Sequence, residues 1–83
     1  MSRDEFIKWL SDVTFFTLKS ANIYKDVYEI DSEYYGCHHI EVLKGDYEVV
    51  VWEDIDNEDE GRFTYEEFIK FWKDLENEIG ASL

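Results

Sequence analysis

The chain has 83 residues, which is enough for one domain and no more. Hydrophobic residues make up 45% of it and aromatic residues 18%, so a packed core is expected in spite of the charge. There are 21 Asp and Glu against eight Lys and Arg, a net charge of −13. So acidic a surface repels nucleic acids and anionic lipids, which excludes direct binding to either and favours a basic partner or a cation.

The cysteine content and the N-terminal sequence bear on the compartment. Cys37 is the only cysteine, so no internal disulfide can form. The first ten residues carry acids where a secretory signal needs a long apolar run, and no stretch approaches the ~20 apolar residues of a membrane span. We therefore expect a single domain, residues 1–83, in a reducing cytoplasm.

The first predicted element is a helix from Arg3 to about Lys19. Ser2 followed by Glu5 is typical of a capping box at a helix N-terminus. Residues 20–22, with the sequence Ser-Ala-Asn, indicate its exit. Apolar side chains recur at helical spacing and are expected to face the core: Phe6, Trp9, Leu10, Val13 and Phe16.

Three antiparallel strands are predicted in the middle of the chain. They are a short β-prone run, Val27–Ile30, and two longer runs, Tyr34–Leu43 and Tyr47–Ile55. A hairpin turn at Lys44-Gly45-Asp46 separates the longer two. In the third run Tyr47, Val49, Val51 and Ile55 alternate with Glu48, Val50, Trp52 and Asp54. Both sets contain apolar residues, which predicts an interior strand that is partly buried on both faces.

A second helix is predicted to begin after Thr64. Thr64 and Glu67 form a capping box, and Phe63 with Phe68 occupy the positions of a hydrophobic staple. Gly80 stands where a left-handed C-cap residue is expected. The apolar stripe consists of Phe68, Phe71, Trp72, Leu75 and Ile79. The expected fold is α+β, a three-stranded antiparallel sheet flanked by an N-terminal and a C-terminal helix on one face.

The acidic charge is concentrated in residues 46–67. This stretch holds ten acids and one base, Arg62, so it contributes −9 of the net −13. The acids lie on or beside predicted elements, and their self-repulsion is almost unneutralised. Tyr47, Trp52 and Tyr65 are candidate aromatic contacts with a partner. The candidate partner-binding acids are Glu53, Asp54, Asp56, Glu58, Asp59, Glu60, Glu66 and Glu67.

Residues 56–67 resemble an EF-hand calcium loop. Loop positions 1, 6, 8 and 12 are held by Asp56, Gly61, Phe63 and Glu67. Positions 3 and 5 depart from the pattern, because Glu58 and Glu60 stand where shorter Asp or Asn ligands are usual. The residues before the loop favour a strand over a helix, and no second loop is visible. We expect an acidic loop that leads into a capped helix, and no metal site.

Cys37-His38-His39 contains residue types that bind metals. A zinc site needs three or four ligands, and the sequence has no second cluster. Neighbouring strand residues point to opposite faces, so a packed cysteine with two partly exposed histidines is expected. Phosphate loops, serine elbows and oriented Cys/His pairs are absent as well. We therefore predict no enzymatic activity, no catalytic residues and no cofactor.

In size, charge and aromatic content the whole chain resembles the small acidic phage-encoded inhibitors known as DNA mimics. These include anti-CRISPR, anti-restriction and uracil-glycosylase-inhibitor proteins. The resemblance lies in composition and assigns no residue by position. It implies an inhibitor that occupies the basic nucleic-acid-binding surface of a target, such as a nuclease or effector complex of a bacterial host's defence system. Two alternatives stay open: a calcium-binding EF-hand-like module, and an acidic adaptor or interaction protein without mimicry.

Overall fold

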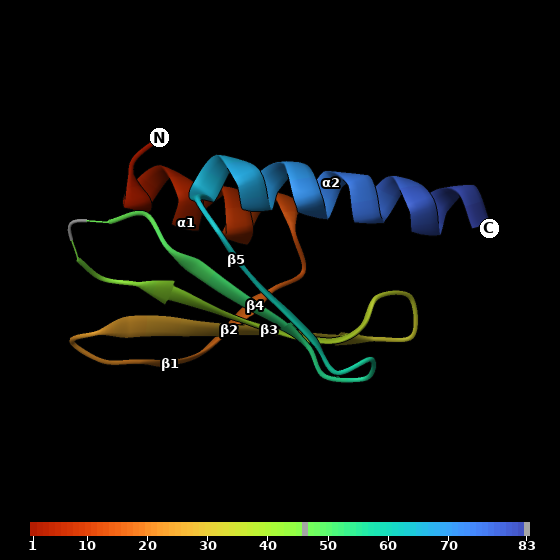
Figure 1. Cartoon of the computed structure of the whole chain (residues 1–83), viewed down its shortest axis with the longest axis horizontal. Coiled ribbons are helices and arrows are strands. Elements are labelled where there is room, and N and C mark those ends of the chain that lie inside the picture. The colour runs from red at the N-terminus through yellow and green to blue at the C-terminus, as the bar shows by residue number, and fades with distance from the viewer. Residues whose placement is uncertain (46, 83) are drawn as a thin grey trace.

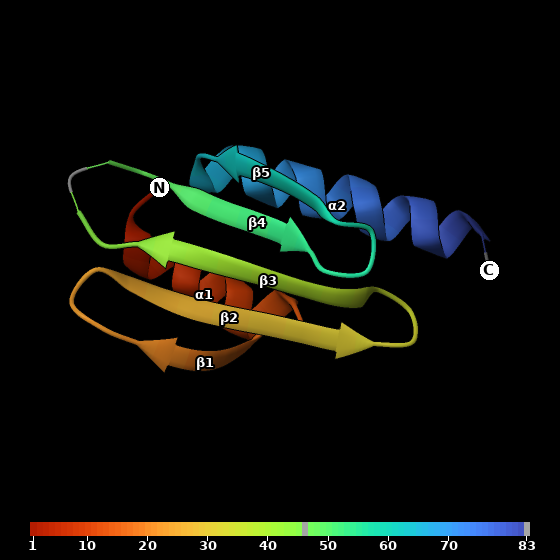
Figure 2. The same ribbon diagram turned by 60° about the horizontal axis from the view of Figure 1, so that its bottom comes forward.

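The computed structural model describes residues 1–45 and 47–82, without the side chains of residues 81 and 82. Two helices cover one face of an antiparallel sheet (Figure 1). The elements are α1 (Arg3–Val13), β1 (Thr17–Ala21), β2 (Lys25–Ser32), β3 (Gly36–Leu43), β4 (Val50–Asp54), β5 (Asp59–Phe63) and α2 (Tyr65–Ser82). The strands lie side by side in chain order (Figure 2). The predicted α+β class is confirmed, but the sheet has five strands rather than three.

Both helices begin at the capping boxes that the sequence predicts. Ser2 Oγ accepts from the Glu5 amide at 3.2 Å, and the Glu5 carboxylate accepts from the Ser2 amide at the same distance. At α2 the Thr64 amide donates to Glu67 Oε1 at 2.9 Å, and the Glu67 amide donates to Thr64 Oγ1 at 3.3 Å. The predicted C-cap is wrong, because α2 continues through Gly80, whose φ is not positive.

Helix α1 ends at Val13, about one and a half turns before the predicted end. The Thr14 hydroxyl donates to the Leu10 carbonyl oxygen at 2.6 Å and accepts from the Phe16 amide at 3.2 Å. Such local bonds give the backbone an alternative to the next helical turn. The chain then enters β1, so the prediction of helix as far as Lys19 is wrong.

The predicted strands correspond to β2, β3 and β4, but β3 and β4 are shorter than the predicted runs Tyr34–Leu43 and Tyr47–Ile55. The run Val27–Ile30 is the centre of the longer β2, and β3 and β4 form an antiparallel hairpin with Val42 opposite Val50. The predicted turn at residues 44–46 lies at the start of the segment that connects β3 and β4. Its last residue, Asp46, lies outside the residues that the structure describes. Strand β5 occupies a segment that was predicted to be loop, and it pairs with β4. Strand β4 is therefore an interior strand, as expected.

The core lies between the helices and one face of the sheet. In β4 the side chains that face the helices are Val50, Trp52 and Asp54, all buried, whereas Val51 and Glu53 lie on the opposite face. The buried hydrophobic side chains are Phe6, Leu10, Phe16, Tyr28, Ile30, Ile40, Val42, Val50, Trp52, Tyr65, Phe68 and Trp72. Neither helix covers the second face of the sheet, and we call this second face the open face (Figure 1).

Candidate partner-binding surface

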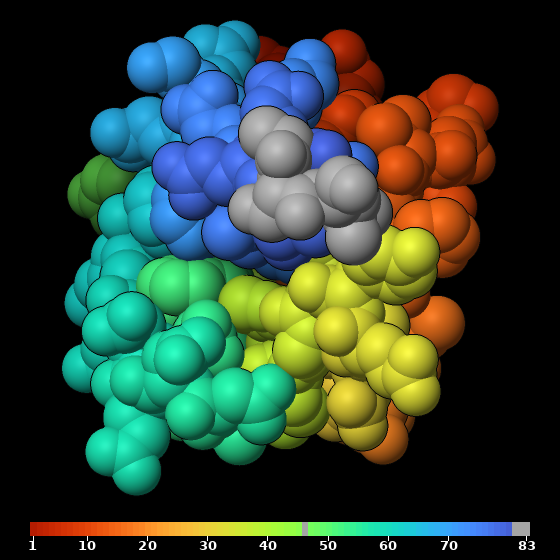
Figure 3. All heavy atoms as spheres, turned by 90° about the vertical axis from the view of Figure 1, so that its right-hand side faces the viewer, coloured from red at the N-terminus to blue at the C-terminus, as the bar shows by residue number. Residues whose placement is uncertain are grey.

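The β4–β5 hairpin brings five of the eight candidate acids together. Glu53 pairs with Glu60 across the two strands, and residues 55–58 form the turn that connects them. The strands lie about 4.8 Å apart, so Glu53 and Glu60 adjoin on the open face, whereas Asp59, opposite Asp54, lies on the other side of the hairpin. All five are exposed, and we call them the acidic hairpin: Glu53, Asp56, Glu58, Asp59 and Glu60. Figure 3 shows the hairpin turn in green to cyan, protruding beside the yellow β2–β3 turn.

No cation neutralises the acidic hairpin within the part of the chain that the structure describes. None of its five carboxylates lies within ion-pair distance of a Lys, Arg or His. Arg62 lies within β5, opposite Val51, and it too forms no ion pair with a described residue. Glu53 and Glu60 lie directly opposite each other. Like charges in this position destabilise a sheet. These charges therefore lower the stability of the fold.

Asp54 does not belong to this exposed patch. Its side chain is only 9% exposed, and its two oxygens accept from the Asn57 amide at 3.2 Å and from Asn57 Nδ2 at 2.8 Å. Burial raises its pKa, but the hydrogen bonds from Asn57 outweigh burial and hold the pKa below its usual value. Asp54 is thus an ionised group that shapes the turn. The prediction that it binds a partner is not supported by this position.

Asp56 joins the hairpin to the start of strand β3. Its Oδ2 accepts from the Cys37 amide at 2.9 Å, and the Ile55 amide donates to the Cys37 carbonyl oxygen at 2.9 Å. Gly36 allows this approach, because a Cβ there would lie 2.6 Å from Asp56 Oδ2 and because its φ is +78°. The hairpin turn is therefore held against the first residues of β3.

Glu58 has a left-handed backbone conformation, with φ of +56°. This conformation costs an L-residue other than Gly or Asn about 1 kcal/mol or more. It lets the chain reverse into β5, where Asp59 pairs with Asp54. The turn thus contains a glutamate where glycine would be more favourable.

Glu66 and Glu67 lie in the first turn of α2. The five residues of β5 separate them from the hairpin turn, a distance of about 17 Å. Glu67 caps the helix, and the hydrogen bonds from Thr64 lower its pKa. Glu66 Oε1 lies 4.0 Å from the N-terminal amine. Both carboxylates are exposed, but the structure does not bring them into the acidic hairpin.

The aromatic candidates lie in different environments. Tyr47 is 82% exposed, just before β4. Trp52 and Tyr65 are only 8% and 3% exposed and pack in the core, so the prediction that they contact a partner is not supported. Trp52 packs against Phe71, with ring centroids 4.7 Å apart. Of the three, Tyr47 alone is on the surface.

The open face contains a hollow beside the acidic hairpin. Val51 lines a cavity of about 260 Å³ that extends over the open face from β2 to β5. A shallower hollow of about 550 Å³ adjoins it and includes Arg62. Glu53 and Glu60 contribute to the first cavity, so part of the acidic hairpin forms its rim. The lining residues of the first cavity are Val27, His39, Glu41, Val51, Glu53 and Glu60.

Sequence reasoning overlooked Glu41 and His39 as part of this surface. The alternation of buried and half-buried residues along β3 places both on the open face. His39 lies between Glu29 of β2 and Glu53 of β4 in the strand register, and its Nε2 is 2.6 Å from Glu29 Oε2. The period-two pattern of residues 37–43 was the signal that could have located them.

The two adjacent histidines point to opposite faces, as predicted. His38 is buried rather than partly exposed: its Nδ1 accepts from Trp52 Nε1 at 3.1 Å, and its Nε2 contacts the Tyr35 carbonyl oxygen. This pattern requires the neutral imidazole with the proton on Nε2. Burial and nearby carboxylates raise the pKa of the Cys37 thiol. Among the described residues, no three His, Cys, Asp or Glu side chains are arranged to hold a metal ion.

The segment that resembles an EF-hand loop is not flanked by two helices. Residues 50–54 before it form a strand, and residues 59–63 within it form another. An EF-hand loop lies between two helices and wraps its ligands around one ion. The expected acidic stretch leading into a capped helix is present, but most of it is hairpin rather than loop.

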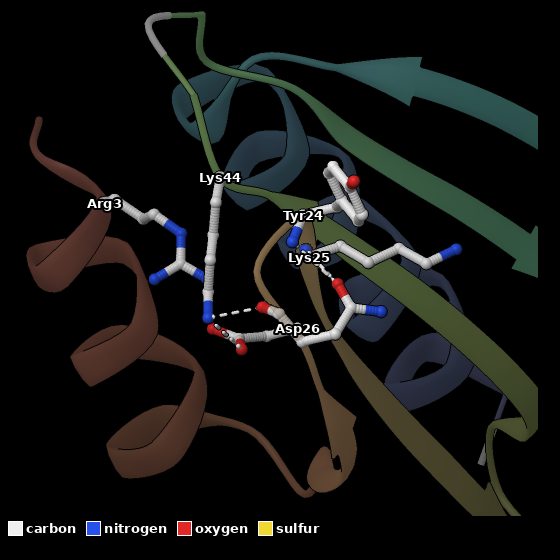
Figure 4. Close-up of polar contacts among 6 residues, drawn as sticks. Arg3, Tyr24, Lys25, Asp26 and Lys44 are labelled. Atoms are coloured by element: carbon white, nitrogen blue, oxygen red, sulfur yellow. Dashed lines mark hydrogen bonds and ion pairs between the residues drawn. The ribbon is translucent and has the colours of Figure 1, made fainter.

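Three carboxylates of β2 and β3, those of Asp26, Glu29 and Glu41, differ from those of the hairpin, because cations pair with them. Arg3 of α1 and Lys44 after β3 both contact Asp26, Lys44 at 3.4 Å (Figure 4). Burial raises the pKa of Asp26, but the bond to Arg3 and the charges of Arg3 and Lys44 outweigh it and lower the pKa. Lys25 Nζ lies 2.5 Å from Glu41 Oε1.

No helix in the described part of the chain has the length and apolar character to cross a membrane. Comparisons with protein-family models, with curated proteins and with solved structures find no match to this chain.

Proposed function

We propose that this protein is an acidic inhibitor that binds the basic nucleic-acid-binding surface of another protein, such as a bacterial defence nuclease, in place of nucleic acid. The observation that carries the proposal is the acidic hairpin: five exposed carboxylates, none of which has a Lys, Arg or His within ion-pair distance among the described residues. Arginine and lysine side chains that hold phosphates would bind these carboxylates.

The rigidity of the hairpin supports binding. The turn is held by Asp54 from within and by Asp56 against the start of β3. Charges that are already fixed in place lose less conformational entropy on association than charges on a flexible tail. Opposite charges on a basic partner would also speed the encounter.

The hollow on the open face adds a feature suited to a basic protein partner. Val27 and Val51 form its apolar part, and Glu41, Glu53 and Glu60 surround them. A lysine or arginine can lay its aliphatic stem on such a floor while its charged head reaches the carboxylates. An acidic adaptor without mimicry would use the same surface, so competition with nucleic acid separates the two proposals.

The test begins with capture of the target from a bacterial lysate on the immobilised protein. The matched bait changes Glu53, Glu58, Asp59 and Glu60 to lysine and leaves Asp54 and Asp56, which hold the turn, intact. The control bait changes Asp4, Glu33, Glu48 and Asp74 to lysine; these are exposed acids outside the hairpin. Both baits change the net charge by eight units, from −13 to about −5. A target retained by wild type and control but lost from the hairpin variant supports the proposal.

The captured protein must also bind DNA or RNA, and wild-type binding should weaken steeply between about 50 and 200 mM salt. A target that the hairpin variant retains equally well would refute the assignment to the hairpin.

A further inference from the structure

Residues 13–25 differ in charge from the rest of the chain, and we call them the β1 edge segment. They contain no Asp or Glu and two lysines, in a chain of net charge −13. The segment holds the end of α1, all of β1 and the turn into β2. Contiguous exposed apolar surface marks interaction sites. Its exposed large hydrophobic side chains are Val13, Phe15, Leu18, Ile23 and Tyr24.

Strand β1 is a free edge of the sheet. It pairs with β2 alone among the described strands, and all its residues are exposed. A free edge presents unpaired backbone groups that can pair with another strand. The opposite edge, β5, begins with Asp59 and Glu60, charges that discourage such pairing. Strand β1 has only Lys19, whose Nζ is 3.5 Å from Glu29 Oε1 and is thus neutralised within the chain.

We propose that the β1 edge segment binds a second copy of the chain, with the two β1 strands antiparallel about a two-fold axis. Leu18 lies opposite the buried Tyr28, so it is on the helix-covered face. The Leu18 side chains of both copies would lie on the same face of one continuous sheet. This proposal concerns the edge opposite the acidic hairpin and does not depend on the proposed function.

The charge distribution favours a second copy at this edge. The acidic strand β5 is four strand spacings from β1, or about 19 Å. This is more than twice the Debye length of about 8 Å at physiological salt, so repulsion between the two hairpins is screened. A contact between β1 and the β5 edge of another copy would instead place the exposed Leu18 beside a strand that begins with Asp59 and Glu60. The self-matching contact joins two segments that contain no acids and leaves both acidic hairpins at the far ends.

Sedimentation equilibrium of the full chain tests the proposal, at concentrations from about 5 to 500 µM in 0.15 M NaCl. Wild type should show a reversible monomer–dimer equilibrium that strengthens at higher salt. Leu18→Glu should raise the dimer dissociation constant about tenfold or more. Tyr47→Glu is the matched control, because Tyr47 is also highly exposed but lies outside the β1 edge segment, and it should leave the equilibrium unchanged. Leu18 is 56% exposed, so circular dichroism should show that both variants fold.

Hydrogen exchange gives a second measurement on the unmodified protein. Backbone amides of β1 should exchange more slowly at high protein concentration, while those of β5 should not. A monomer at the highest concentration, or equal effects of Leu18→Glu and Tyr47→Glu, would overturn the proposal. Polymers that grow with protein concentration, and that Asp59→Lys disrupts as well as Leu18→Glu, would show that β1 of one copy pairs with β5 of the next. That result would overturn the two-fold arrangement.

Discussion

The β1–β3 side of the sheet and the β4–β5 hairpin carry similar carboxylates in opposite electrostatic settings. On the first side, Asp26, Glu29 and Glu41 each have a cation within ion-pair distance. In the hairpin, Glu53 and Glu60 face each other with no cation among the described residues. The first set stabilises the fold, whereas the second set opposes it. Stability therefore does not explain Glu53 and Glu60.

The largest expected effect comes from removing a paired charge. Asp26→Asn would leave Arg3 and Lys44 without their carboxylate, and should lower the free energy of unfolding by about 2 kcal/mol, or the Tm by roughly 10 °C. Glu53→Gln in the hairpin should change it by no more than about 0.5 kcal/mol. Urea unfolding of the two variants compares the regions directly. Equal losses would show that the hairpin carboxylates are also stabilising.

Acidification should act on the same groups. The pKa values of Asp26 and Asp54 are lowered in the folded protein, so their stabilisation is complete above the unfolded-state pKa of Asp, about 3.9. It is lost as the pH falls toward and through their folded-state values. Urea unfolding between about pH 2 and 6 should therefore show stability falling at the acid end, with a shallower fall in Asp26→Asn. An identical pH dependence in wild type and Asp26→Asn would contradict the assignment.

A smaller gain is expected in the hairpin turn. Glu58→Gly removes the cost of a left-handed glutamate, and should raise the free energy of unfolding by about 0.5 kcal/mol after the entropy cost of glycine. The matched change Glu60→Gly, two residues along in β5, should lower it by about 0.5–1 kcal/mol. Thermal unfolding of both variants gives the signs. A destabilising Glu58→Gly would mean that the glutamate side chain makes a compensating contact.

The smallest effect is that of salt. The Tm should rise by a few degrees between roughly 0.01 and 0.5 M NaCl, because screening weakens repulsion within the hairpin. Changing Glu53, Glu58, Asp59 and Glu60 to their amides should remove more of this rise than the same change at Asp4, Glu33, Glu48 and Asp74. A Tm that falls with salt would indicate that ion pairs dominate in both regions.

Side-chain pattern predicted the parts of the fold that depend on local chemistry. Thr64 and Glu67 fixed the start of α2, and the staple residues Phe63 and Phe68 do pack, with ring centroids 5.9 Å apart. Strand β1 was missed because Phe16 continues the helical spacing of α1 even though the hydroxyl of Thr14 ends the helix.

Strand β5 was missed for a different reason. Its residues Asp59, Glu60 and Gly61 have low β-propensity, and only pairing with β4 makes them a strand. Charge alone located the acidic stretch, but it could not tell which of the acids are buried and which are exposed. Asp54 lies on the same face of β4 as the buried Trp52, whereas Glu53 lies on the other face. Both faces of β4 also carry a valine, so hydrophobicity alone does not distinguish them. Which face meets the helices is decided by the tertiary packing.

Competition on the captured target tests the central claim most directly. A labelled oligonucleotide bound to that target is titrated with wild type, with the hairpin lysine variant and with the control lysine variant. We predict that wild type and control displace the oligonucleotide and that saturating nucleic acid blocks wild-type binding, while the hairpin variant displaces it at least about tenfold less well. A ternary complex of target, oligonucleotide and wild-type protein would contradict the account.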